Sequence, residues 1–230
     1  DGQTFFSLAA SHGVPDKTVI EIRQDSRRRF WFATERGVAM LDGKRLIRLG
    51  TADGLLCGET RAICEDNHGH IWFATDSGLF EYDGDHVQRL TAKDGLGNDN
   101  LWCVMCDSRG RIWCGGQGGG VSCYSRGRFV IYTMADGLPG NNCRAIGEDR
   151  NGNLWFCLWE AGVVRFDGDS FSLYSSRNAL LENRTHGFLE DHDGSLWFAL
   201  PMAGVSCFNP YSFETLASEP VSETLIKDQA

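Results

Sequence analysis

The sequence lacks any run of about 18 apolar residues, the length that a membrane-spanning helix needs. It also lacks a basic region: the net charge is −9, and the longest basic cluster, Arg27 to Arg29, falls in an expected turn. Nucleic-acid binding depends on neutralising phosphates with Lys and Arg, so we expect no nucleic-acid partner. The chain opens with neither a secretory signal nor a Met, which is typical of an excised or mature piece.

The cysteines also lack the spacing that is typical of a metal-binding site. Among nine cysteines, Cys103 and Cys106 form a lone CxxC, with no second pair or matched His partners. Residues three apart on a strand point to opposite faces of the sheet. We therefore expect the cysteines to fill small apolar positions, and we expect no metal and no cofactor. The cysteine count leaves the redox compartment open.

What the sequence does contain is a repeat built on an Asp followed six residues later by a Trp. The five pairs are Asp25–Trp31, Asp66–Trp72, Asp107–Trp113, Asp149–Trp155 and Asp191–Trp197. Successive Asp residues are 41, 41, 42 and 42 positions apart. Four units place a Gly three residues after the Asp, and the first unit has Arg28 there. A "DGL" precedes the Asp in units two to four, starting at Asp53, Asp94 and Asp136.

Five copies in register make the Asp architectural. At the start of a tight turn its carboxylate can accept backbone N–H groups, while Gly supplies the left-handed conformation. The turn then joins two strands of a hairpin, and the Trp on the second strand can pack between neighbouring sheets. A calcium loop would need about six to eight oxygen ligands, and each turn offers one repeated carboxylate.

Each unit contains four short β-like runs separated by short turns, and no helical apolar period lasts a full helix. This pattern predicts an all-β fold, a β-propeller of four-stranded antiparallel blades of 41–42 residues. Residues 1–10 align with a fourth strand, so we expect them to end a preceding blade. Five blades are then expected at about 11–51, 52–92, 93–134, 135–176 and 177–218, with 219–230 leading to a further blade. The phase favours an arc of a larger propeller. A closed five-blade ring is the remaining alternative.

Two stretches carry a family resemblance: "DGLLCGETRAICEDNHGHIWFATDSGLFEYDGDHVQRL" and "DGLPGNNCRAIGEDRNGNLWFCLWEAGVVRFDGDSFSLY". They resemble the two-component regulator propeller repeat, and the resemblance covers nearly all of residues 1–218. It implies a seven-bladed propeller in the periplasmic or otherwise extracytoplasmic sensor region of hybrid histidine kinases and related receptors. Sensors of this kind often detect oligosaccharides and pass the signal to an output domain, here one outside the chain. The third and fifth units depart most from the pattern.

In a blade, the loop before the first strand, here called the leading loop, lies on the same face as the loop between strands two and three. The residue five before the repeat Asp changes chemistry from unit to unit, which indicates a binding position. Arg pairs with oxyanions, and an indole stacks on a sugar ring. The predicted ligand-binding residues are Arg61, Trp102, Arg144, Trp159, Glu160 and His186. Residues of the leading loops are further candidates: Asn98, Asn100, Asn141, Asn142, Asn183 and Arg184.

A structural alternative pairs Arg61 and Arg144 with nearby Glu side chains and packs Trp102 against a neighbouring blade. Three functions are considered. The first is a non-catalytic sensor of an oligosaccharide or similar small ligand, with no catalytic residues. The second is an enzyme of the streptogramin-lyase type, for which His186 and Glu160 would supply the base and acid. The third is a protein–protein interaction platform, such as one for homodimerisation of the receptor.

Overall fold

The structure, a computed structural model, describes residues 18–49, 58–209 and 212–215. Its regular structure in these ranges is five four-stranded antiparallel sheets and two single-turn 3-10 helices, η2 (Ala92–Asp94) and η3 (Met134–Asp136). No helix in the described part of the chain has the length and apolar character to cross a membrane. The predicted all-β propeller fold is confirmed.

The sheets follow one another in chain order, and each is built from four consecutive strands. The first comprises β1 (Val19–Gln24), β2 (Phe30–Thr34), β3 (Gly37–Asp42) and β4 (Arg45–Leu49). The second comprises β5 (Thr60–Glu65), β6 (Ile71–Thr75), β7 (Gly78–Tyr82) and β8 (Val87–Leu90). The third comprises β9 (Leu101–Cys106), β10 (Ile112–Gly116), β11 (Val121–Ser125) and β12 (Arg128–Tyr132). The fourth comprises β13 (Cys143–Glu148), β14 (Leu154–Leu158), β15 (Gly162–Phe166) and β16 (Phe171–Tyr174). The fifth comprises β17 (Gly187–Glu190), β18 (Leu196–Leu200), β19 (Gly204–Asn209) and β20 (Ser212–Thr215).

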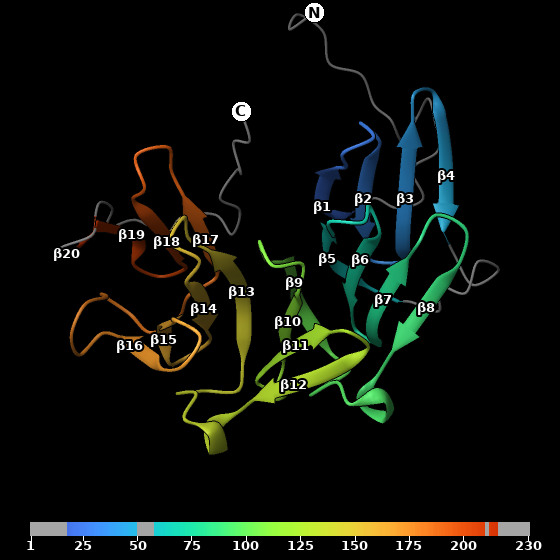
Figure 1. Cartoon of the computed structure of the whole chain (residues 1–230). Coiled ribbons are helices and arrows are strands. Elements are labelled where there is room, and N and C mark those ends of the chain that lie inside the picture. The colour runs from blue at the N-terminus through green and yellow to red at the C-terminus, as the bar shows by residue number, and fades with distance from the viewer. Residues whose placement is uncertain (1–17, 50–57, 210–211, 216–230) are drawn as a thin grey trace, which may run out of the picture.

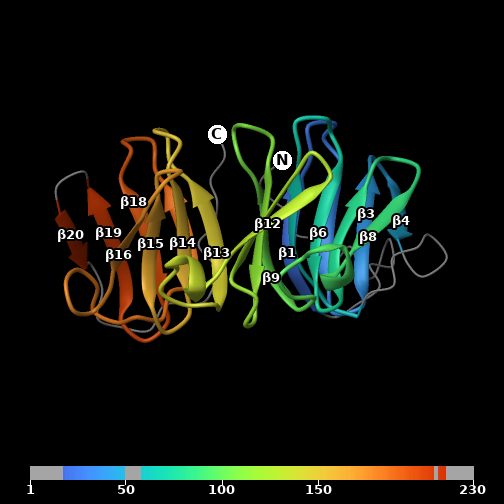
Figure 2. The same cartoon turned by 60° about the horizontal axis from the view of Figure 1, so that its bottom comes forward.

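The five sheets are arranged along an arc, from the blue sheet to the red sheet in Figure 1. The first strands β1, β5, β9, β13 and β17 contact one another in sequence. They form the inner side of the arc, and the fourth strands lie outside, as the side view in Figure 2 also shows. The expected earlier strand at 1–10 and the tail at 219–230 lie outside the described residues. The blade boundaries stay a prediction of the repeat.

Each repeat Asp begins the turn between the first and second strands of its sheet, as predicted. The backbone N–H three residues on donates to the Asp carbonyl, for example Gly152 to Asp149 at 2.8 Å. That residue has positive φ in every unit, and in the first unit the non-glycine Arg28 adopts φ 64°. The turn therefore requires the left-handed conformation even where the sequence does not supply a Gly.

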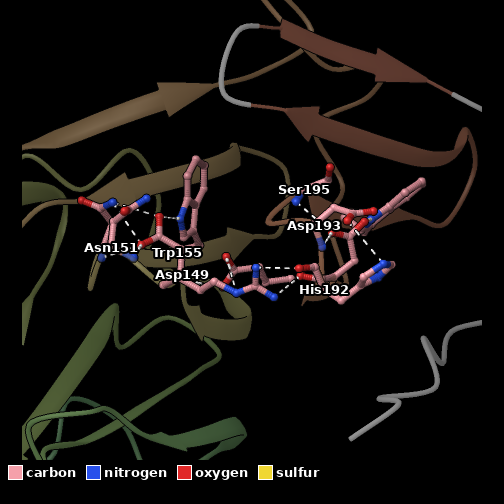
Figure 3. Close-up of polar contacts among 11 residues, drawn as sticks. Asp149, Asn151, Trp155, His192, Asp193 and Ser195 are labelled. Carbon is pink, nitrogen blue, oxygen red and sulfur yellow. Dashed lines mark hydrogen bonds and ion pairs between the residues drawn. The ribbon is translucent and has the colours of Figure 1, made fainter. Parts of the chain in front are cut away.

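The Asp carboxylate also accepts the indole N–H of its Trp. All five bonds are present, at 2.8, 2.9, 2.8, 2.9 and 2.7 Å from the first unit to the fifth. At Asp149, shown in Figure 3, Oδ1 accepts the backbone N–H groups of Asn151 and Asn153, and Oδ2 accepts Trp155 Nε1. The spacing of six residues thus fixes the ring as well as the turn.

The Trp rings pack against the following sheet. Trp31 lies 5.7 Å from Phe73, and Trp155 lies 5.6 Å from Phe198, between ring centroids. The first four repeat Trp residues are at most 3% exposed. Trp197, in the last sheet, is half-buried, and no described sheet follows it. These rings are part of the apolar cores that join neighbouring sheets.

A second link between sheets joins the turns themselves. The residue after the repeat Asp donates its backbone N–H to the Glu that ends the next first strand. Ser26 bonds Glu65 at 2.7 Å, Ser108 bonds Glu148 at 2.6 Å, and Arg150 bonds Glu190 at 2.9 Å. These bonds join neighbouring sheets at three of the four junctions, at the ends of the sheets that carry the Asp turns.

The cysteines occupy core positions, as expected. Six of the eight described cysteines are buried, the other two, Cys106 and Cys207, are partly buried, and none of the eight is in a disulfide. Burial raises the pKa of the Cys157 thiol to about 12 and that of the Cys106 thiol to about 11. With their pKa values raised, these two thiols are protonated near neutral pH.

Candidate ligand-binding site

The antiparallel pairing brings the leading loop of a sheet next to its second loop. Cys143, at the start of β13, pairs with Leu158, at the end of β14. The following residue, Trp159, donates its backbone N–H to the carbonyl of Asn142 at 2.8 Å. In the third sheet Gln117 makes the same bond to Asn100 at 3.0 Å. Side chains from these two loops consequently meet at one face of the arc.

On this face the structure brings together Arg144 and two tryptophans. The Arg144 guanidinium lies 4.2 Å from the centre of the Trp102 ring and 5.0 Å from that of Trp159. The three residues come from β9, from β13 and from the loop after β14. A cation held between two aromatic faces gains about 0.5–2 kcal/mol from each contact, depending on how far it is desolvated. The structure therefore gives Arg144 aromatic neighbours, and the sandwich links the third and fourth sheets.

The fifth sheet extends this group. The guanidinium of Arg184, in the leading loop of β17, lies 5.3 Å from the Trp159 ring. The His186 ring lies 4.8 Å from the same indole. We call Trp102, Arg144, Trp159, Arg184 and His186 the aromatic–arginine cluster. It places two guanidiniums and two indoles from three neighbouring sheets at one face.

A pocket of about 380 Å³ lies beside the cluster. Its lining comprises Glu160, Glu182, Asn183, Arg184 and Met202. Glu160 adopts φ 71°, a left-handed conformation at the tip of the β14–β15 loop, and Met202 is 67% exposed. Oxygen atom Oε1 of Glu182 is buried and accepts no hydrogen bond from the residues that the structure describes. The pocket thus offers acceptors, one guanidinium and an apolar wall, a combination that suits a hydroxyl-rich molecule.

Arg61 has a different environment from Arg144, although the two occupy the same repeat position. Its Nε lies 2.8 Å from Glu59 Oε2, and its Nη1 donates to the Leu101 carbonyl at 3.0 Å and to the Asn100 side chain. This pairing with Glu is the structural alternative predicted for it. Arg61 bridges the second and third sheets, and its part in ligand binding stays a prediction.

The amides of the leading loops mostly hold those loops together. Asn141 Oδ1 accepts the Met134 backbone N–H at 3.0 Å, and Asn183 Oδ1 accepts that of Ser176 at 2.7 Å. Asn142 Oδ1 accepts the Gly118 backbone N–H at 2.8 Å. These oxygens stabilise the fold of the face, and the amide nitrogen of Asn100 is also used, since it donates to Gln117 Oε1 at 3.0 Å.

Sequence reasoning did not name Glu182, and it named Arg184 only among the residues of the leading loops. Aligned on the repeat, they replace Gly140 and Asn142 of the preceding unit. A signal for them existed, because both positions are charged in this loop, whereas the third and fourth leading loops carry only Gly or Asn there and the first and second carry one acidic residue each, Asp16 and Glu59. His186 and Glu160 are the base and acid that the lyase alternative would need: His186 packs on Trp159, Glu160 lines the pocket, and their pairing stays a prediction.

Comparison with known proteins identifies the repeats. Residues 54–77 and 137–160 match the model of the family described as "Two component regulator propeller". Both segments span a Gly-Leu, an Asp turn and its Trp. The chain therefore contains two-component regulator propeller repeats. A search of curated proteins found no match.

Solved structures share the fold. The extracellular domain of BT3049 from B. thetaiotaomicron, described as a hybrid two-component system, aligns with a TM-score of 0.78 and 23% identity, over 89% of this chain and 29% of its own. That of BT4673, from the same organism and described in the same way, aligns at 0.76 and 20%, over 94% and 33%. Virginiamycin B lyase from Staphylococcus aureus aligns at 0.70 and 12%, over 85% and 68%. The chain thus spans about a third of the two extracellular domains.

Proposed function

We propose that this chain, which contains two-component regulator propeller repeats, is a non-catalytic ligand-binding part of an extracytoplasmic sensor. Its similarity in fold to extracellular domains of two-component systems supports this role and location. In this proposal the bound state of the propeller is passed to an output domain elsewhere in the parent protein. The chain itself supplies recognition.

The observation that carries the proposal is the aromatic–arginine cluster beside the 380 Å³ pocket. The half-buried Trp159 offers apolar surface to a sugar ring, while Arg184 in the pocket and Arg144 beside it offer donors for hydroxyl or carboxylate oxygens. Glu160 and Glu182 accept hydroxyl protons. A ligand with hydroxyls and an acidic group, such as an oligosaccharide containing a uronic acid or a sulfate, uses all of these groups.

The test is calorimetry on the sensor region of the parent protein with neutral and acidic oligosaccharides. Arg144→Ala should weaken binding of the acidic ligand by about 1.5–3 kcal/mol, the range for a hydrogen bond to a charged group, or about 10- to 150-fold. Trp159→Ala should weaken neutral and acidic ligands alike. Arg109→Ala is the matched control, because Arg109 is exposed on an Asp turn at the other end of the sheet. Its affinity should equal that of the wild type.

Two results would contradict the proposal. If no oligosaccharide binds the intact sensor region, the interaction platform becomes the better explanation of this face. The same holds if Arg144→Ala unfolds the protein while Arg109→Ala does not, because the cation would then be part of the scaffold.

A lyase is the second candidate, favoured by the shared fold with virginiamycin B lyase and by the position of His186 near a pocket lined by Glu160 and Glu182. Incubation with a streptogramin B antibiotic, followed by mass spectrometry, separates the two. The sensor function expects intact antibiotic. Ring-opened product that disappears with His186→Ala would establish the enzyme.

A further inference from the structure

The second sheet departs from the other four at two positions near its Asp turn. The residue four after the repeat Asp is His70, where the other units have Arg29, Arg111, Asn153 and Ser195. The residue paired with the repeat Trp on the third strand is Glu81, where the others have Met40, Cys123, Arg165 and Cys207. Two residues with metal-binding side chains therefore appear together in one unit only.

These side chains converge on the repeat carboxylate. His70 Nδ1 lies 2.7 Å from Glu81 Oε1 and 3.7 Å from Asp66 Oδ2. The potential ligand atoms of all three residues lie within 4.8 Å of one another. Their side chains are 33%, 18% and 8% exposed for His70, Glu81 and Asp66, so the group is accessible from one side.

The first and third sheets show that this position is built for a cation. There the residue corresponding to His70 is an arginine, whose Nε lies 2.6 Å from Oδ2 of the Asp. The guanidinium also faces the repeat Trp, at 5.3 Å for Arg29 and 5.0 Å for Arg111. In the second sheet the guanidinium is absent and a further carboxylate, Glu81, has been added. The second sheet thus places two carboxylates around one imidazole, where the first and third sheets place one carboxylate against a guanidinium.

Space for the ion is present. A pocket of about 240 Å³ adjoins His70 and Glu81 and is lined further by Asp83, His86, Val87 and Gln88. Asp83 and His86 belong to the β7–β8 turn and are 44% and 86% exposed. This turn adds a second imidazole and a second exposed carboxylate at the open side of the cluster.

We propose that Asp66, His70 and Glu81 bind a divalent transition-metal ion, for which Zn²⁺ is the best match. Imidazole and carboxylate ligands suit Zn²⁺, and a tetrahedral ion with bonds of about 2.0–2.2 Å holds its ligand atoms about 3.4 Å apart. The Asp66–His70 separation of 3.7 Å fits this value. The His70–Glu81 pair, now 2.7 Å apart, opens by rotation of the partly exposed Glu81 side chain. The fourth ligand is water or His86 from the adjoining turn.

The test is titration of the full chain with Zn²⁺ by calorimetry, and with Co²⁺ by absorption spectroscopy. One saturable site is expected. His70→Arg introduces the residue of the first and third units. The variant should therefore fold, because the new guanidinium can pair with the Asp66 carboxylate as Arg29 and Arg111 pair with theirs. Glu81→Met introduces the residue of the first unit. Each change removes one ligand and should weaken Zn²⁺ binding by at least about 100-fold, since loss of a mere supporting residue costs about 10- to 100-fold.

His192→Asn is the matched control, because His192 also lies in an Asp turn beside a carboxylate, Asp193, but is 90% exposed. Its Zn²⁺ affinity should equal that of the wild type. Co²⁺ spectra separate the proposed ligands from the cysteines, since only thiolate coordination gives a sulfur-to-metal charge-transfer band. The proposal would be overturned by a sulfur-to-metal band in the Co²⁺ spectrum or by the absence of saturable Zn²⁺ binding. It would also be overturned if His70→Arg and Glu81→Met both kept the Zn²⁺ affinity of the wild type.

Discussion

Replacing Asp149 by Asn should destabilise the protein more than its loss of one charge suggests. Both carboxylate oxygens accept N–H groups: Oδ1 from two backbone positions, and Oδ2 from Trp155 Nε1 at 2.9 Å and Asn153 Nδ2 at 2.9 Å. An Asn side chain must direct its NH₂ at one of these sets of donors, whichever rotamer it takes. At least one donor then loses its acceptor, and the indole of Trp155 is 1% exposed and cannot reach water.

The magnitude follows from two contributions. A buried donor without an acceptor costs about 1–3 kcal/mol, and a hydrogen bond to a charged group contributes about 1.5–3 kcal/mol. Asp149→Asn should therefore lower the free energy of unfolding by about 2–3 kcal/mol. Asp169→Asn, on an exposed turn of the same sheet, is the control and should stay within about 0.5 kcal/mol of the wild type.

A double-mutant cycle with Trp155→Phe isolates the indole bond. Phe has no N–H to leave unpaired, so Asp149→Asn should cost about 1–2 kcal/mol less in that background. Urea denaturation of the four proteins, followed by tryptophan fluorescence and circular dichroism, measures this coupling. Additive effects, equal within about 0.5 kcal/mol, would refute the view that the indole bond fixes the turn.

Three further predictions concern the same sheets. Trp155→Ala should lower the free energy of unfolding by about 3–5 kcal/mol, the cost of removing a buried aromatic ring, and a near-zero shift in urea midpoint would show that the ring is not an inter-sheet contact. Gly147→Ala should cost about 1–3 kcal/mol because its Cβ would lie 1.8 Å from the Phe188 ring, and a second change, Phe188→Leu, should recover part of that loss in thermal melts. The backbone N–H groups of Ser170 and its predecessor lower the pKa of Asp167 to about 2. Because this lies below the unfolded value of about 3.9, the stabilisation is complete above about pH 5 and is lost as pH falls towards 2. Urea midpoints of Asp167→Asn should consequently fall less between pH 5 and pH 2 than those of the wild type, and parallel curves would contradict the assignment.

The sequence by itself determined the fold because the repeat encodes local structure. A turn and the strand after it are specified by an Asp, a left-handed residue three positions later and a Trp six positions later. Both elements form through contacts between residues that are close in the sequence. Five copies in register then indicate sheets of equal size that stack on one another. The Asp–Trp hydrogen bond was not predicted, although its spacing was visible, since the pattern alone does not show which way an indole N–H points.

Only the tertiary structure decided which variable residues meet. Arg61 and Arg144 occupy one repeat position, yet Arg61 pairs with Glu59 and Arg144 lies between two indoles, because the neighbouring loops differ. His70 and Glu81 are eleven residues apart, and no sequence pattern links them. The pairing of β6 with β7 brings His70 Nδ1 to 2.7 Å from Glu81 Oε1. The physical reason is that a sheet fixes each strand's register locally, whereas contacts across strands and between sheets depend on side chains supplied by distant parts of the chain.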